Sequence, residues 1–247
     1  MNCNGHVLLR INRVFSCRVV KKINRFVVEV LSPSGNRLLV HNTNTGRLED
    51  ILFPGSKIYC APRSRPGKTT HYIIGSSVYG GSLINTQIQE RAFMIAVEKH
   101  LIPWLVNCRI SKYQPRIDDS RFDFELDCNN KNLILELKSA VLKGEHGEAM
   151  YPDCPTIRGR RHIHELSKLS KEGYKTAIVF IAGFPCASYF IPNDKSDPMI
   201  RKGLIRAIKD GVIVKSVGLC VEMSNNAAVI RIYKPEIPVR IFNLRKA

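Results

Sequence analysis

The sequence predicts an α+β or α/β protein in which a small N-terminal β-barrel precedes a larger α/β domain with a mixed sheet. Three observations predict this class. Short strand-like runs separated by turn residues fill the first 85 residues, helical periodicity begins after Gly81, and strands and helices alternate from there onward. We therefore expect two domains, one over residues 1–85 and one over residues 86–247.

The first domain contains five short segments with strand composition between about residues 18 and 86. They are RFVVEVL, RLLVHN, KIYCAPR, HYIIGSSVY and SLINT, and turn-forming residues separate them. Five short strands in so few residues predict a closed barrel of the oligonucleotide/oligosaccharide-binding (OB) kind, which presents one face and its loops to nucleic acid. A small barrel of another topology would have the same strand pattern.

The second domain begins with a helix over residues 87–99, QIQERAFMIAVEK, which ends before Pro103. The strand VNCRISKY, a hairpin and a basic helix within TIRGRRHIHELSKLSKEG follow. The last elements are the buried strand YKTAIVFIA, the helix SDPMIRKGLIRAIKDG, capped by Ser196 or Asp197, and the strand VIVKSVGLCVEM. Helices and strands in this order predict an α/β layer with a mixed sheet.

Composition limits the class of protein. With 247 residues and 44% hydrophobic content the chain can bury a sizeable core. Its longest apolar run, AIVFIAGF, is far shorter than the roughly 20 residues of a membrane-spanning helix, and no signal pattern opens the chain, so we expect a cytoplasmic protein. The eight cysteines form no CxxC pair, which predicts buried reduced thiols; a disulfide is the alternative if the source is a hyperthermophile.

The net charge of +17 indicates a polyanionic partner, since Lys and Arg side chains neutralise phosphates and release counterions. The charge is densest at the start of the chain. Residues 1–80 hold 12 Lys and Arg against 3 Asp and Glu, a net charge of +9, while residues 81–247 hold 26 against 18, a net charge of +8. We therefore expect the barrel to contact nucleic acid, although a merely soluble basic surface has the same composition.

The segment SRFDFELDCNNKNLILELKS, residues 120–139, predicts a β-hairpin with one apolar face. Its apolar side chains alternate along two runs and are Phe122, Phe124 and Leu126, then Leu133, Leu135 and Leu137. Pairing Phe122 with Leu137 buries all six and leaves a six-residue turn, DCNNKN. That register sets Asp123 across from Glu136. A register shifted by two residues would instead pair Asp123 with Lys138 in an ordinary salt-bridged hairpin.

Two opposed carboxylates destabilise a hairpin unless a positive charge lies between them. Mg²⁺ and Mn²⁺ prefer oxygen ligands, so Asp123, Glu136 and the backbone carbonyl of Leu137 are the candidate metal ligands. Lys138, on the face of Glu136, would orient a metal-bound water or neutralise transition-state charge. Asp123, Glu136 and Lys138 thus predict a phosphodiesterase site, while a solvated charged face is the ordinary explanation of such spacing.

Several blocks occur in order from about residue 20 to residue 239. They are HNTNTGRL, LFPGSKIY, INTQ, DSRFDF, ELKSAVL, AMYPDCPTIRGRRHIHEL and EIPV, and together they resemble the signature blocks of the sugar fermentation stimulation protein A (SfsA) family. The resemblance implies DNA binding, a regulatory role in sugar metabolism, and an OB-like barrel followed by a domain similar to the PD-(D/E)XK nucleases. In that nuclease motif Asp123 matches the aspartate, and Glu136-Leu137-Lys138 matches the E-x-K.

The chain departs from the family pattern in two places. Phe122 precedes the aspartate where the motif has Pro, a change that the nuclease superfamily tolerates. The helix after INTQ carries Met94 and Ile95 where family members usually carry glutamates. A supporting carboxylate from this helix could only be Glu90 or Glu98.

Two sets of side chains are candidate nucleic-acid contacts. The first lies at a helix N-terminus, where free N–H groups also suit a phosphate, and comprises Arg158, Arg160 and Arg161. The second lies in the barrel and comprises Arg25, His41, Asn44, Arg47, Arg65 and Lys68. The aromatic residues Phe26, Tyr59 and Tyr72 are candidates for stacking on bases, but we expect them in the core. His162 and His164 do not form an HExxH pattern, so zinc is not expected. No nucleotide cofactor is expected either.

These observations favour a cytoplasmic DNA-binding protein with a possible Mg²⁺- or Mn²⁺-dependent nuclease site. One alternative is a non-catalytic DNA-binding regulator of sugar metabolism whose nuclease-like domain is vestigial. Another is an RNA-binding protein, because barrels of this kind accept single strands of either nucleic acid. No membrane partner is expected.

Overall fold

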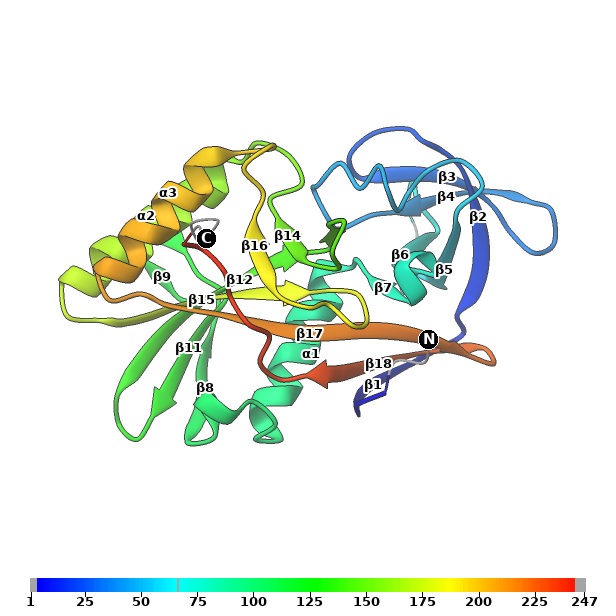
Figure 1. The fold of residues 1–247 in the computed structure, drawn as a ribbon. Coiled ribbons are helices and arrows are strands. Elements are labelled where there is room, and N and C mark those ends of the chain that lie inside the picture. Colours follow the sequence, from blue (N-terminus) through cyan, green and yellow to red (C-terminus); the bar gives the residue numbers. More distant parts are fainter. Residues whose placement is uncertain (1–3, 66, 243–247) are drawn as a thin grey trace. The chain divides into compact units, whose positions relative to one another are not determined.

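The structure is a computed structural model that describes residues 4–65 and 67–242. The chain forms two compact units (Figure 1). The first contains the chain as far as Ala92 together with Gly183–Cys186 and Gly218–Lys234, and the second contains Phe93–Ala182, Ala187–Val217 and the chain from Pro235 on. The expected division between residues 85 and 86 stays a prediction. Among the described residues, no helix combines the length and apolar character of a membrane span.

A closed five-stranded barrel forms the centre of the first unit (Figure 1). Its strands are β2 (Phe15–Lys22), β3 (Val27–Leu31), β4 (Arg37–His41), β5 (Lys57–Pro62) and β6 (His71–Ser76). Antiparallel pairs join β2 to β3, β3 to β4, β2 to β5 and β5 to β6, and a parallel pair between β4 and β6 closes the ring. The predicted closed barrel is therefore confirmed, and its topology leaves no open edge.

The predicted set of barrel strands was wrong in two respects. The first barrel strand is β2, whose sequence FSCRVVKK was not assigned, and SLINT contributes only the two-residue strand β7 (Ser82–Leu83) beside β6. Cys17 and Val19 of β2 are buried, so the alternation of a half-buried strand is present. The three cations of this segment weaken its apolar signal, which is why the pattern was missed.

Two strands at opposite ends of the chain complete the first unit. They are β1 (His6–Asn12) and β18 (Ala227–Lys234), which pair antiparallel, and β18 also pairs with the 218–224 part of β17 (Ile213–Ser224). Neither β1 nor β18 was expected from the sequence. Helix α1 (Thr86–Glu98) begins in this unit, where the Asn85 side chain accepts a hydrogen bond from the Ile88 N–H (3.1 Å).

The second unit holds a mixed sheet. Its strands β8 (Cys108–Tyr113), β11 (Phe124–Cys128) and β12 (Asn132–Ala140) pair antiparallel in that order, and β15 (Lys175–Ala182) lies parallel to β12. The expected mixed-sheet α/β domain is confirmed. The shorter elements of this unit are η2 (Pro103–Leu105), β9 (Arg116–Ile117), β10 (Ser120–Arg121), β13 (Leu142–Lys143), β14 (Ala149–Tyr151) and β16 (Phe190–Pro192).

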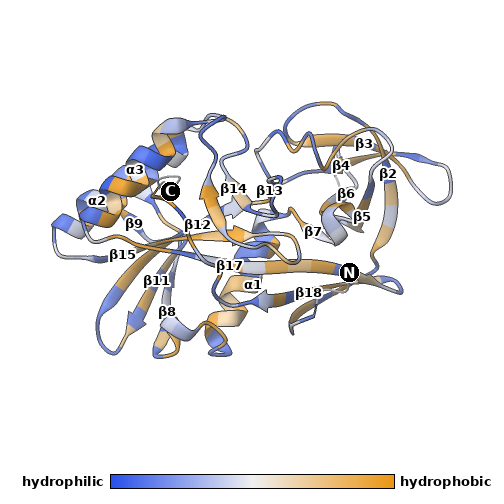
Figure 2. Ribbon diagram, in the orientation of Figure 1, coloured by the Kyte–Doolittle hydropathy of each residue, from blue (hydrophilic) through white to orange (hydrophobic). Residues whose placement is uncertain are grey.

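Two helices of the second unit lie against each other (Figure 1). They are α2 (Ile157–Lys171) and α3 (Pro198–Lys209), and both carry hydrophilic and hydrophobic stretches (Figure 2). The Thr156 side chain caps α2 by accepting from the Gly159 N–H, and Asp197 rather than Ser196 caps α3 by accepting from the Met199 N–H. The apolar stripe of each helix faces inward, as its spacing predicts.

The hairpin forms in the expected register from Phe124 on, but the expected pair of Phe122 with Leu137 is not part of the ladder, and Leu137 is half-buried rather than buried. Phe124 pairs with Leu135 and Leu126 with Leu133, and the register shifted by two residues does not occur. The pairing continues to Asp127 and Asn132, so the connection is shorter than the six residues expected. Burial explains the register, because all four paired apolar side chains are at most 3% exposed.

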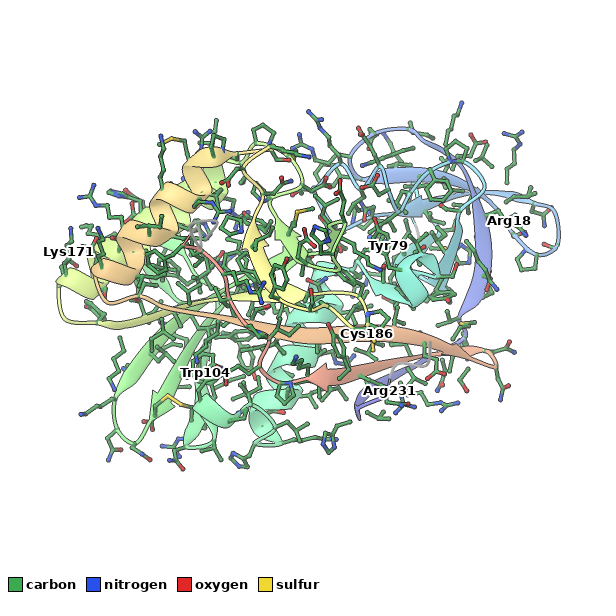
Figure 3. All side chains as sticks on the ribbon, in the orientation of Figure 1. Arg18, Tyr79, Trp104, Lys171, Cys186 and Arg231 are labelled. Carbon is green, nitrogen blue, oxygen red and sulfur yellow. A yellow bond between two sulfur atoms is a disulfide. The ribbon has the colours of Figure 1, made fainter. Side chains whose placement is uncertain are left out.

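The expectation of buried reduced thiols was wrong for several cysteines, since Cys186 is exposed and Cys220 is disulfide-bonded. Cys108 on β8 and Cys128 at the end of β11 are cross-strand partners and form a disulfide, visible as a yellow bond in Figure 3. The two residues are 20 positions apart, and their spacing has no CxxC signature. Only the pairing of β8 with β11 brings the two sulfurs together. Cys17 and Cys60 are free thiols buried in the first unit, as expected.

Candidate functional site

Asp123 lies directly before β11, between two buried phenylalanines. Phe122 and Phe124 are 1% and 0% exposed, and they turn the Asp123 side chain to the opposite face of the strand. Asp123 Oδ2 accepts a hydrogen bond from the backbone N–H of Leu137 (2.6 Å), so the carboxylate lies beside the residue that separates Glu136 from Lys138. The hairpin therefore brings Asp123 to the E-x-K segment.

Glu136 is a buried carboxylate, 3% exposed, in the middle of β12. Its Oε1 atom accepts a hydrogen bond from Lys138 Nζ (2.5 Å) and lies 2.5 Å from His162 Nδ1. Its Oε2 atom is buried and has no hydrogen-bond partner within the part of the chain that the structure describes. One oxygen of Glu136 thus has two partners, and the other has none among the described residues.

The charges of this group support one another. Burial by itself raises the pKa of Glu136, but the Lys138 ammonium and the His162 hydrogen bond outweigh burial and hold that pKa below its ordinary value. For Lys138, burial opposes the charged form, and the carboxylate of Glu136, with Tyr151 and Asp123, nevertheless raises its pKa. At neutral pH Glu136 is therefore an anion and Lys138 a cation.

His162 joins the site from α2 and was not predicted to do so. Its ring is 1% exposed and packs edge-on against Phe122, with ring centroids 5.9 Å apart. Arg158 Nε donates to His162 Nε2 (3.4 Å), and a neutral ring that accepts at Nε2 donates from Nδ1 to Glu136 Oε1. Its helical spacing from Leu166 could have indicated that His162 faces inward.

Tyr151 lies next to the same group. Burial raises the pKa of its hydroxyl, although the Lys138 ammonium and a hydrogen bond with Thr156 act in the opposite direction. The hydroxyl lies over the first turn of α2, where a Cβ on Gly159 would come within 2.4 Å of Tyr151 Oη. A side chain at position 159 would therefore displace Tyr151, which explains the glycine in this turn.

The three arginines predicted to bind phosphate are exposed on the first turn of α2. Arg158 is hydrogen-bonded to His162, and Arg160 Nε lies 3.4 Å from Asp197 Oδ2. Arg161 is exposed on the same turn. Arg158 therefore links this basic turn to the Glu136 site through one histidine.

The candidate nucleic-acid contacts of the barrel differ in how exposed their side chains are. Arg25, Arg47, Arg65 and Lys68 are exposed, and His41 is half-buried. Asn44 is only 7% exposed, and its amide donates to the Ile84 carbonyl (3.3 Å) and accepts from the Gly46 N–H (3.0 Å). Asn44 is thus occupied in holding its own loop.

The aromatic residues of the barrel include one correction. Tyr59 is buried and Tyr72 is half-buried, but Phe26 is 47% exposed rather than in the core. Phe26 follows a turn between β2 and β3, where the chain has not yet entered the barrel wall. Strand alternation cannot place a residue outside a strand, which is why the expectation failed.

A metal site at Glu136 would have few protein ligands. Within residues 4–65 and 67–242, no group of three or more His, Cys, Asp or Glu side chains is arranged to hold a metal ion. The predicted set of Asp123, Glu136 and the Leu137 carbonyl has two carboxylates, which suits Mg²⁺ or Mn²⁺ because these ions retain several waters. Glu90 is half-buried in the first unit, and Glu98 is exposed.

Two family models match the chain. The model described as the SfsA N-terminal OB domain matches residues 20–86, and the model described as the sugar fermentation stimulation protein RE domain matches residues 87–225. The first match agrees with the closed barrel of the first unit. Together the two models cover most of the chain, so the similarity concerns both domains.

Curated relatives and the solved structure of a Pyrococcus furiosus protein agree with this match. The sugar fermentation stimulation protein homologs of Pyrococcus furiosus and Archaeoglobus fulgidus are 41% and 35% identical, each over 95% of this chain and 99% of the relative. The structure of Pyrococcus furiosus SfsA in complex with Ca²⁺ has a TM-score of 0.87 and 38% identity, over 95% of this chain and 99% of that chain. A repair endonuclease from Pyrococcus abyssi has a TM-score of 0.32 and 11% identity, over 83% of this chain and 88% of that one.

Proposed function

The chain belongs to the sugar fermentation stimulation protein A family, and from this membership and the geometry of the site we propose that it is a cytoplasmic DNA-binding protein whose second domain hydrolyses phosphodiester bonds. Hydrolysis depends on a divalent cation, Mg²⁺ or Mn²⁺, held by Asp123, Glu136 and the backbone carbonyl of Leu137. The barrel holds the phosphate backbone through its exposed cations.

The buried Oε2 atom of Glu136 carries the proposal. An ionised oxygen removed from water without a partner costs on the order of 1–3 kcal/mol or more. No hydrogen-bond donor among the described residues meets this atom, whereas Oε1 contacts both Lys138 and His162. A cation bound at Oε2 would satisfy it. The Ca²⁺ in the structure of the similar Pyrococcus furiosus protein supports a divalent cation in this family.

The protein side chains have separate roles in the proposed reaction. When bound, a divalent cation supplies Lewis-acid polarisation of a phosphate oxygen and lowers the pKa of a coordinated water. Lys138 is protonated at neutral pH, because its pKa is raised, and it donates hydrogen bonds to the charge that develops on the phosphate oxygens. Asp123 and Glu136 hold the cation. His162 keeps Glu136 oriented through Oε1, so that Oε2 stays available.

Nucleic-acid binding is supported by charge and exposure. Residues 1–80 carry a net charge of +9, and Arg25, Arg47, Arg65 and Lys68 present exposed cations on the barrel. Each phosphate neutralised by such a cation adds to the salt dependence of binding, with a slope of about 0.9 per contact on duplex DNA. The proposal therefore includes an affinity that falls steeply as salt rises.

A metal titration combined with a cleavage assay tests the enzymatic half of the proposal. Labelled single-stranded and duplex DNA and RNA are incubated with wild-type protein and increasing Mg²⁺ or Mn²⁺. Asp123→Ala and Lys138→Ala should lose cleavage by at least about 100-fold, as expected for groups that act in the transition state. Lys131→Ala, which removes an exposed lysine from the loop of the same hairpin, is the matched control and should cleave normally.

Wild-type protein that leaves every nucleic acid intact with both metals would remove the enzymatic half. The second candidate function, a non-catalytic DNA-binding regulator, would then be preferred. One observation favours it: Lys138 and His162 already saturate Glu136 Oε1, as in a purely structural ion pair. For this candidate, Glu136→Ala would change neither DNA affinity nor the response to metal. Competition between DNA and RNA at fixed salt separates either function from an RNA-binding one.

A further inference from the structure

Phe26 is an exposed aromatic ring on a rigid part of the barrel. The Asn24 side chain accepts hydrogen bonds from the backbone N–H groups of Phe26 (2.9 Å) and Val27 (3.0 Å). The Phe26 carbonyl accepts a hydrogen bond from the N–H of Asn42 (2.8 Å) on the other side of the strand pair. The ring is nevertheless 47% exposed. Both the backbone N–H and the backbone C=O of Phe26 are thus hydrogen-bonded, while its side chain projects to solvent.

The imidazole ring of His41 lies nearly parallel to the Phe26 ring. The two rings are stacked, with centroids 6.5 Å apart and an interplanar angle of 19°, and His41 pairs with Val27 across β3 and β4. Burial, and after it the positive charge of Arg63, lowers the pKa of His41, so the imidazole is neutral at physiological pH. Phe26 therefore lies nearly parallel to a neutral imidazole and remains 47% exposed, so a ring face can accept another flat group.

Two cations lie close to the exposed ring, one by sequence and one through its partner His41. Arg25 is its neighbour in sequence, and Arg63, whose charge reaches His41, begins the loop that carries Arg65 and Lys68. Arg63 is anchored at the base of this loop, where its Nη1 donates to Thr69 Oγ1 (2.9 Å). In the described part of the chain, no ion pair joins Arg25, Arg63, Arg65 or Lys68 to a carboxylate. Their charges are therefore available to an anion.

Further apolar side chains lie on the same outer face of the two strands. Leu31 and Leu39 are 39% and 38% exposed, and Leu39 precedes His41 by two residues, so both project from one face of β4. The cross-strand partners of these leucines, Arg37 and Glu29, form an ion pair with each other, so the unpaired charge comes from the other cations. Phe26 with these cations suits a ligand that is flat and apolar on one side and negatively charged on the other. An unpaired nucleotide has this chemistry.

We propose that Phe26 is a stacking platform for an unpaired nucleobase, and that the barrel therefore takes single-stranded nucleic acid in preference to a duplex. This inference rests on the proposed binding of nucleic acid. Both faces of a base inside a duplex are covered by its neighbours, whereas a base in a single strand can place one face on Phe26. Arg25 and the cations of the 63–68 loop hold the flanking phosphates.

The experiment measures the affinity of the full-length protein for four labelled probes by fluorescence anisotropy, with EDTA present to prevent cleavage. The probes are a single-stranded DNA, an RNA of the same sequence, the DNA duplex, and the single-stranded DNA with abasic sites. Wild type is compared with Phe26→Ala, Phe26→Trp and Phe53→Ala. Phe53 is the matched control because it is 45% exposed in the same unit.

Phe26→Ala should bind the single strands about 5- to 150-fold more weakly than wild type, which is the range for loss of one stacked base. Its affinity for the duplex should be unchanged, and it should no longer distinguish the abasic strand from the intact one. Phe26→Trp should retain the affinity, and Phe53→Ala should resemble wild type. Comparing the affinities for the single-stranded DNA and the RNA of the same sequence shows whether the barrel prefers deoxyribose or ribose.

Two results would overturn the inference. If wild type binds the single strand but Phe26→Ala matches Phe53→Ala, or if the duplex binds more tightly than the single strand, the stacking platform is excluded while nucleic-acid binding stands. If wild type binds none of the four probes, the proposed nucleic-acid function fails and the stacking platform fails with it. Unchanged circular dichroism of Phe26→Ala would exclude misfolding as the cause of a loss.

Discussion

The Glu136 site and the Phe26 surface are both built around charged side chains, but they differ in what neutralises those charges. Around Glu136 the protein supplies its own counterion, Lys138, and a hydrogen bond from His162, because a buried carboxylate must be paired. Around Phe26 the cations are exposed and have no acidic partner within the described residues. Changes at the first region should therefore cost stability, and changes at the second should cost binding.

The largest expected effect comes from separating the buried ion pair. Lys138→Met leaves the Glu136 carboxylate, 3% exposed, without its cation, and loss of one partner of such a pair costs about 3–5 kcal/mol. Urea denaturation of wild type and variant measures this difference. The double variant Glu136→Leu/Lys138→Met removes both charges and should recover much of the loss. A single variant as stable as wild type would contradict the view that the pair is desolvated.

Two histidines on one helix provide a closer comparison. His162 is buried and bonded to Glu136, whereas His164, two residues further along, is exposed. His162→Ala should lower the free energy of unfolding by about 2 kcal/mol, since it removes a hydrogen bond to a charged group. His164→Ala should change it by less than about 0.5 kcal/mol. Equal losses in thermal denaturation would show that the helix, not the site, accounts for both.

The exposed cations of the barrel should behave in the opposite way. Arg65→Ala/Lys68→Ala should leave the free energy of unfolding within about 0.5 kcal/mol of wild type, because neither side chain is buried. The same variant should reduce the slope of log affinity against log salt by about 2, one unit for each phosphate contact. Lys209→Ala, an exposed lysine on α3, is the charge control and should leave the slope unchanged.

The smallest effect is expected from a surface carboxylate that the protein does neutralise. The hydroxyl of Ser167 holds the pKa of Asp210 below its ordinary value against a small opposing effect of burial, and Lys171 and Arg206 act in the same direction. A lowered folded-state pKa stabilises the protein above the unfolded pKa of about 4, and this stabilisation is lost as the pH falls through the lower folded pKa.

Asp210→Asn should therefore melt at a slightly lower temperature than wild type at pH 7, and the two midpoints should converge as the pH falls from about 4 through the lower folded-state pKa of Asp210. Melting curves by circular dichroism at a series of pH values measure the convergence. A difference that persists at the lowest pH would mean that Asp210 acts through its shape or its hydrogen bonds and not through its charge.

The two regions also differ in how well the sequence predicted them. Alternating apolar residues predicted which face of the hairpin is buried and left two registers open, and the structure has the one that pairs Phe124 with Leu135 and Leu126 with Leu133. The barrel class followed from strand spacing. The cysteine pair, the strands β1 and β18, and the first barrel strand did not follow, since each depends on which segment lies beside which.

By itself the sequence determined local features: which residues of the hairpin strands and of the helices turn inward, which two residues could cap α3, and where charge accumulates. The tertiary structure alone decided which distant side chains meet. His162 reaches Glu136 from 26 residues further along the chain. Phe26 is exposed, although a phenylalanine at this position of the sequence was expected in the core. The physical reason is that periodicity reports one element at a time, whereas burial and pairing depend on the neighbours that packing supplies.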